Sequence, residues 1–310
     1  MSLLKLARWT QHDLLRLAAT EKRPQLLVIP YSHYCELAQF AVDASGTDYR
    51  RHAFAPGEHV LAALNLRVGR EEKHLSRSAR MDVMPRTAEE VGKERPKPRS
   101  NATAVPALVT EKVVLTDSWD ILEACTGPLV LGDAFKKLMD ERVAPLSRQR
   151  AYEFLFKPSN KNIWDGLCCH GRSPLFNAFW WAASDRLTDG MIKMFRTADA
   201  DAMKLCDARL EEALDELDAM VEANAGPYLG GDAPASDDLA LAALVGPLAN
   251  PSEYVRGDYK ALFDQMLAQD AECAERVEAW RERPSGKHAL MVYAKHRCSP
   301  LEGAHGMQYR

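Results

Sequence analysis

The sequence predicts a small α/β domain followed by a larger all-helical domain, and three observations support this fold class. A short apolar run at residues 25–30 is typical of a buried, parallel-type strand. An amphipathic helix and a second strand-like stretch follow it, which together make a βαβ unit. Beyond about residue 127 the apolar pattern is helical. We therefore place a helical extension at 1–21, the α/β domain at 22–126 and the all-helical domain at 127–310.

Composition narrows the class of protein further. The 310 residues include 40 Lys and Arg against 44 Asp and Glu, a formal net charge of -4, which does not favour a nucleic-acid partner. No apolar run reaches the roughly 20 residues that span a bilayer, and the N-terminus does not read as a secretory signal. Seven cysteines are too sparse for a disulfide scaffold. We expect a cytoplasmic protein with reduced thiols, no membrane span and no nucleic-acid partner.

The elements of the α/β domain follow one another in a simple order. Apolar residues at i, i+3, i+4 and i+7 predict a helix over 34–41, and residues 49–54 predict the second strand. Residues 104–116 hold two short apolar runs around a turn, which predicts an antiparallel hairpin. Asp117 and Ser118 then begin a helix, with Ser118 as its capping residue.

Two other regions have a distinct pattern of charged or apolar residues. An insertion at about 55–103 contains a charged segment, 67–99, with ten Lys and Arg and six Asp and Glu, a local net charge of +4. Because both signs are interleaved and aromatic residues are missing, a solvated surface is favoured over a nucleic-acid or membrane patch. In the helical domain, an apolar stripe follows an acidic helix over 210–221, and residues 239–245 are apolar on every face, as in a core helix.

Three segments carry a more specific signal. The first is residues 30–41, the second combines Val105-Pro106 with residues 117–121, and the third is residues 227–238. In this order, across most of the chain, they resemble the soluble glutathione S-transferase family. The first is similar to the segment with the family's catalytic Ser, Cys or Tyr, and the third to the loop and capping box before the core helix.

The resemblance implies a fold and an activity. The N-terminal domain would be thioredoxin-like and would bind glutathione as a co-substrate, and the C-terminal domain would be all-helical. The enzyme would be a homodimer that activates the glutathione thiolate for attack on a hydrophobic electrophile, as in detoxification. It implies no metal and no tightly bound cofactor. The capping Ser or Thr of the core helix is replaced by Ala235, so we expect Ser236 or water to satisfy that helix end.

Ser32 and Cys35 are the candidate catalytic residues. A free thiol is mostly protonated at neutral pH, so glutathione activation needs a donor aimed at its sulfur. Ser32 matches the family's serine-type donor and sits where a helix N-terminus favours an anion; a simple helix cap is the other interpretation. Cys35 makes a Ser-x-x-Cys pattern that disfavours dithiol exchange. It is either a small buried residue or the centre of cysteine-based glutathione chemistry.

The candidate substrate-binding residues surround these two positions. Tyr31 and His33 flank Ser32. By resemblance, a cis peptide bond before Pro106 would turn the backbone of Val105 toward the cysteinyl part of glutathione. Also by resemblance, the γ-glutamyl end would be bound by the candidates Asp117 and Ser118. An ordinary strand-initial proline and an ordinary helix cap are the alternatives.

Other readings stay open. Cys168, Cys169 and His170 lack a second ligand pair, so we expect no metal there. The aromatic cluster at 176–181 would line an acceptor pocket or, for most of its members, pack in the core. The competing functions are a non-catalytic, transferase-like binding or assembly protein and a glutathione-dependent thiol transferase or reductase that uses Cys35.

Overall fold

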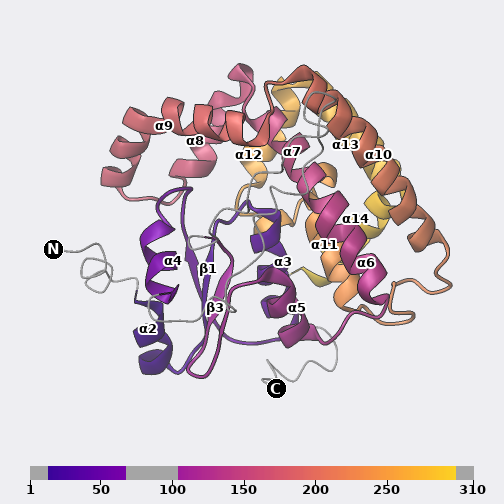
Figure 1. Ribbon diagram of the computed structural model, residues 1–310, viewed down its shortest axis with the longest axis horizontal. Helices are drawn as coiled ribbons and strands as arrows, with labels where there is room; N and C mark the ends of the chain where they lie inside the picture. The colour runs from indigo at the N-terminus through magenta and orange to yellow at the C-terminus, as the bar shows by residue number, and fades with distance from the viewer. Residues whose placement is uncertain (1–12, 68–103, 298–310) are drawn as a thin grey trace, which may run out of the picture.

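A four-stranded sheet stands at one side of the molecule in a computed structural model that describes residues 13–67 and 104–297 (Figure 1). The strands are β1 (Gln25–Val28), β2 (Arg50–Ala53), β3 (Ala107–Val109) and β4 (Val114–Leu115). Their order is β2-β1-β3-β4, with β1 parallel to β2 and antiparallel to β3. β3 and β4 form an antiparallel hairpin. The two predicted strands and the predicted hairpin are confirmed.

Helices cover both faces of this sheet. Successive strand residues point to opposite sides, and in β1 they are apolar on both, so each face is buried against helices. Leu27 faces α2 (Leu14–Glu21) and α4 (Val60–Arg67), while Leu26 and Val28 face α3 (His33–Ala44) and α5 (Ser118–Thr126). Figure 1 shows the two helix pairs on either side of the strands. The result is a thioredoxin-like arrangement, in which α3 connects the parallel strands β1 and β2.

The remaining helices form the larger part of the molecule. They are α6 (Gly132–Leu138), α7 (Ala144–Leu155), α8 (Lys161–Cys169), α9 (Pro174–Phe195), α10 (Ala200–Glu222), α11 (Ser236–Ala249), α12 (Lys260–Gln269), α13 (Ala271–Glu282) and α14 (Pro284–His296). A π-helical turn, Met139–Val143, joins α6 to α7, and 3-10 turns lie at Pro158–Asn160 and Tyr254–Gly257. The predicted all-helical region is confirmed.

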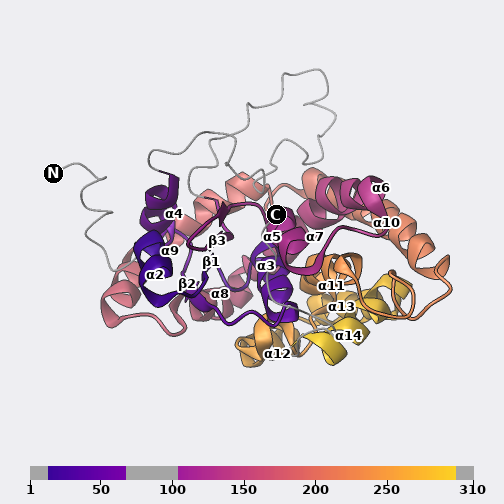
Figure 2. The same ribbon diagram turned by 90° about the horizontal axis from the view of Figure 1, so that it is seen from below.

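Two helices are central to the packing. α11 is buried almost throughout, as its uniformly apolar sequence predicts. α3 is also buried along nearly its whole length, since one face packs on the sheet and another on α11. Figure 2 shows α3 between the strands and the helices α11 and α14. The start of α3 therefore lies where the sheet meets the helical part.

The start of α11 corrects one expectation. Ser236 does not cap the helix, because its hydroxyl donates to the carbonyl of Gly127 at 2.6 Å. The Asp238 carboxylate instead accepts from the backbone N–H of Ala235 at 2.7 Å and of Leu229 at 2.8 Å. The acidic residue of the capping box is thus in use although the capping hydroxyl is missing.

Two further sequence-based expectations concern the charged segment and the membrane spans. The charged segment 67–99, apart from Arg67 at the end of α4, lies outside the described residues. Within 13–67 and 104–297, no helix combines the length and the apolar character needed to cross a membrane.

Candidate active site

Ser32 occupies the N-cap position of α3. Its backbone is extended, with φ -78° and ψ 123°, and its carbonyl accepts the first helical hydrogen bond from Glu36 N–H at 2.8 Å. Its half-buried side chain makes no capping hydrogen bond. The first N–H groups of a helix have no partner within the helix and carry a partial positive charge. A hydroxyl and a positive helix end therefore lie together at this position.

Cys35, one turn further on, is fully buried. Its sulfur accepts a hydrogen bond from the backbone N–H of Ile29 at 3.4 Å. Burial raises the pKa of the Cys35 thiol to about 12 and outweighs the hydrogen bonds from Ile29 and Ser32, which lower it. The thiol is consequently protonated at neutral pH, whereas a nucleophilic cysteine must be a thiolate.

Tyr31 points into the helical part. Its hydroxyl lies 3.3 Å from the sulfur of Cys168, and its ring meets that of Trp164 edge-on with centroids 5.8 Å apart. Its carbonyl accepts a hydrogen bond from the Tyr254 hydroxyl at 3.3 Å. Burial raises the pKa of the Tyr31 phenol well above its usual value. The side chain is thus held in the interface between the two parts of the molecule.

His33 is also buried, but its contacts are incomplete. The side chain is 3% exposed, and its Nε2 atom has no hydrogen-bond partner. Burial, followed by the nearby Arg148 charge, lowers the pKa of His33 to about 3, against a hydrogen bond to the backbone of Ala144 that raises it. The imidazole is therefore neutral at physiological pH.

The remaining predicted residues lie at the starts of β3 and α5. The Val105–Pro106 peptide bond is cis. The cap of α5 is Asp117 rather than Ser118, since the extended backbone of Asp117 lets its carboxylate accept from Trp119 N–H at 2.9 Å. Ser118, the first helical residue, is 1% exposed, and its hydroxyl has no partner.

The strand pairing brings these segments to one edge of the sheet. β1 ends at Val28, just before Ser32. β3 is antiparallel to β1 and therefore starts at that same edge, directly after Pro106. β4 runs back toward this edge, and Ser118 follows it in α5, which packs against α3. Residues predicted from three distant segments thus share one edge.

A small cavity of about 40 Å³ lies beside the start of α3. Tyr31 and His33 contribute one wall, and Arg148 and Tyr152 of α7 contribute another. Sequence reasoning missed Arg148, because nothing in the chain distinguishes it from the other arginines. The aromatic cluster does not line this cavity: Trp180 is buried in the core, while Phe179 and Trp181 are 57% and 63% exposed.

The cysteine pair has no sign of a metal site. The Cys168 sulfur contacts the Tyr31 hydroxyl, and burial raises the pKa of the Cys168 thiol. In the part of the chain that the structure describes, no group of three or more His, Cys, Asp or Glu residues could hold a metal ion.

Comparisons with known proteins now define the fold. No family model matches the sequence, and no curated protein matches it. Among solved structures, a glutathione S-transferase from Ceriporiopsis subvermispora in complex with glutathione matches with a TM-score of 0.50 and 11% identity, over 90% of this chain and 99% of that one.

Two further structures match less closely. A beta-etherase from Sphingobium sp. strain SYK-6 has a TM-score of 0.43 and 12% identity, over 87% of this chain and 99% of that one. A glutathione transferase from Pseudomonas putida, with glutathione disulfide bound, has a TM-score of 0.43 and 14% identity, over 91% and 97%. On the Ceriporiopsis match and the arrangement described above, the chain has the glutathione S-transferase fold.

Proposed function

We propose that this protein is a glutathione transferase. Glutathione binds at the sheet edge shared by Ser32, the cis Val105–Pro106 bond and Ser118. Its thiol loses a proton to solvent, and the thiolate attacks an electrophilic carbon of a hydrophobic acceptor. A carbon–sulfur bond forms, and the leaving group departs with the electron pair of the bond that breaks.

The observation that carries the proposal is the Ser32 hydroxyl, which lies at the start of α3 and does not cap that helix. A hydroxyl that donates to the sulfur stabilises the thiolate more than the neutral thiol, and so does the positive end of the helix. Both effects lower the pKa of the bound thiol and increase the fraction of the nucleophilic form. The glutathione-bound Ceriporiopsis enzyme of the same fold supports glutathione as the thiol.

The protonated state of Cys35 supports Ser32 as the residue that activates the glutathione thiol. Its buried thiol, with a pKa raised to about 12, is a poor nucleophile. The thiol transferase or reductase reading therefore loses support.

Ser118 is suited to the opposite end of glutathione. Its hydroxyl has no partner and lies at the N-terminus of α5, where backbone N–H groups favour a carboxylate. Asp117, whose side chain already caps the helix through Trp119, would hold the γ-glutamyl ammonium group. The homodimer and the cytoplasmic location stay predictions.

The test compares Ser32→Ala with wild type in glutathione binding and in conjugation of a generic aryl halide. Loss of one preorganised donor lowers turnover by about 10²-fold, and ultraviolet absorbance of the bound thiolate should show a higher thiol pKa. Ser173→Ala is the matched control, because Ser173 is also a helix N-cap but its hydroxyl does cap α9, through Phe176 N–H at 3.2 Å. The control should keep wild-type turnover.

Two results would contradict the proposed transferase function and favour another one. Failure of the wild-type protein to bind glutathione at millimolar concentration would favour a non-catalytic binding or assembly protein. A silent Ser32→Ala together with an inactive Cys35→Ser would identify cysteine-based thiol transfer instead.

A further inference from the structure

Arg148 is a half-buried cation without a carboxylate partner among the described residues. Its Nε and Nη2 atoms are buried and make no hydrogen bond. The guanidinium lies over two rings, 5.7 Å from the centroid of Tyr34 and 5.0 Å from that of Phe195. Among residues 13–67 and 104–297, no acidic side chain forms an ion pair with it. An arginine is always charged, so leaving these two donor atoms desolvated and unpaired is costly.

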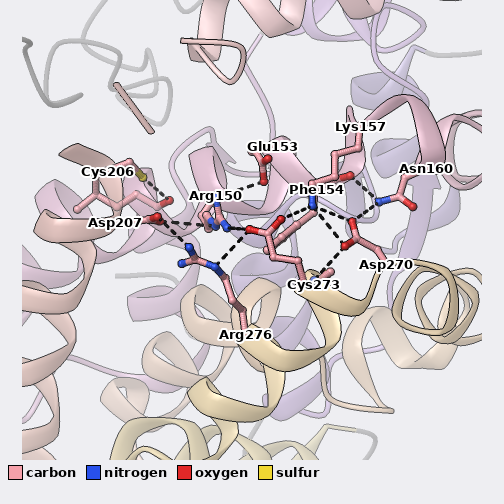
Figure 3. A network of polar contacts seen from close by, with 12 residues as sticks. Arg150, Glu153, Phe154, Lys157, Asn160, Cys206, Asp207, Asp270, Cys273 and Arg276 are labelled. Carbon is pink, nitrogen blue, oxygen red and sulfur yellow. Dashed lines mark hydrogen bonds and ion pairs between the residues drawn. The ribbon is translucent and has the colours of Figure 1, made fainter. Parts of the chain in front are cut away.

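Its neighbour on the same helix, in contrast, is paired with carboxylates. Arg150 is 4% exposed in its side chain and pairs with Glu153 at 3.3 Å and with Glu272 at 3.1 Å. Figure 3 shows Arg150 within this network, together with Asp207 and Arg276. Residues two apart on a helix point to nearly opposite sides. The helix thus presents Arg150 to a set of carboxylates and Arg148 to the cavity.

The cavity wall gives a second, independent observation. His33 Nε2 has no partner, and the His33 side chain, 97% buried, lines the same space as Arg148. His33 is neutral, so Arg148 supplies the only full charge among the described lining residues, none of which is Asp or Glu. A cation without a carboxylate partner and an unpaired ring nitrogen that line one cavity are together the features of a polar binding site.

Size and charge together define the ligand chemistry. About 40 Å³ accommodates a group of about three heavy atoms, or two to three waters. A carboxylate meets that limit, and its two oxygens match the guanidinium fork. The apolar part of the walls includes Leu155 and Phe263. The site therefore suits a carboxylate carried on a hydrophobic body.

We propose that the acceptor substrate of this protein carries a carboxylate, which Arg148 binds in the cavity next to Ser32. The inference rests on the proposed transferase function, since it names the class of acceptor for that site. The two sequence neighbours of Ser32 form part of the cavity wall. Binding the carboxylate there holds the rest of the acceptor beside the start of α3, where the glutathione sulfur would lie.

The test measures binding rather than turnover. Isothermal titration of the full chain with benzoate and with benzamide compares two probes of similar shape and different charge. A charge-assisted hydrogen-bonded pair predicts at least about tenfold tighter binding of benzoate. Arg148→Met should abolish this preference, and Arg148→Lys, which keeps the charge and loses the fork, should retain part of it. Arg142→Met is the control, because Arg142 pairs with Glu216 at the surface.

The outcomes separate this inference from the proposed function. Equal binding of both probes by wild type, or an unchanged preference in a folded Arg148→Met, overturns the inference. If benzoate does not bind but Arg148→Met weakens glutathione binding, Arg148 holds a glutathione carboxylate and the inference is also wrong. If benzoate is preferred while glutathione fails to bind wild type, the carboxylate site stands and the transferase proposal fails.

Discussion

The guanidinium of Arg297 bonds the carboxylate of Glu36 through two nitrogens, at 2.6 and 3.0 Å, and neither side chain is exposed. Arg297 also pairs with Asp43. Both carboxylates belong to α3, whereas Arg297 is the C-cap of α14. The Val255 backbone N–H also donates to Glu36, at 3.0 Å, from a left-handed conformation with φ 53°. These contacts join the thioredoxin-like part to the last helix.

We predict that Arg297→Met strongly destabilises the protein. The change leaves Glu36 buried without its counter-charge, and breaking such a pair costs about 3–5 kcal/mol. The free energy of unfolding in urea measures the loss. Arg209→Met is the control, because Arg209 pairs with Glu212 on the surface, where an ion pair contributes about 0–1 kcal/mol. Equal losses in the two variants would contradict the interpretation of the cluster.

Cys35 should resist alkylation in the folded protein. With a pKa of about 12, only about one thiol in ten thousand is ionised at pH 8, and the sulfur is not exposed. We expect iodoacetamide to leave Cys35 unmodified under native conditions and to modify it after denaturation, as read by peptide mass spectrometry. Rapid native labelling of Cys35 would show an accessible thiolate and would revive the cysteine-based mechanism.

His33 should make the protein less stable as the pH falls. Its pKa is about 3 in the folded protein and about 6.5 when unfolded, so between these values the unfolded chain binds more protons. Stability due to His33 is present above pH 6.5 and decreases as the pH falls toward 3. The loss between pH 7 and pH 5 is about 2 kcal/mol.

His33→Asn provides the comparison for this pH effect, because the asparagine amide can still donate toward Ala144 and does not titrate. Urea unfolding at pH 7 and pH 5 should show a decrease smaller by about 2 kcal/mol in the variant than in wild type. All other titrating groups are common to both proteins. Parallel decreases in the two proteins would mean that the buried imidazole is not kept neutral.

Local patterns were sufficient for most of the fold. The apolar run at 25–30, the hairpin at 104–116 and the apolar segment at 239–245 became β1, the β3–β4 pair and α11, because each pattern reports which faces of an element must be buried. The position of Ser32 before α3 was also predictable from the sequence, since helix starts depend on neighbouring residues. The cap of α5 was misplaced by one residue, within the usual uncertainty of helix ends.

The tertiary structure alone decided the ionisation and the pairing of each candidate group. Whether Cys35 is a thiolate depends on its burial, and whether Arg148 is paired depends on which carboxylates the fold brings near it. Glu36 and Arg297 are more than two hundred residues apart, and no local pattern links them. The sequence by itself determined the elements and their order, because these follow from short-range burial and capping. Charge, access and pairing arise from contacts between distant segments and required the folded chain.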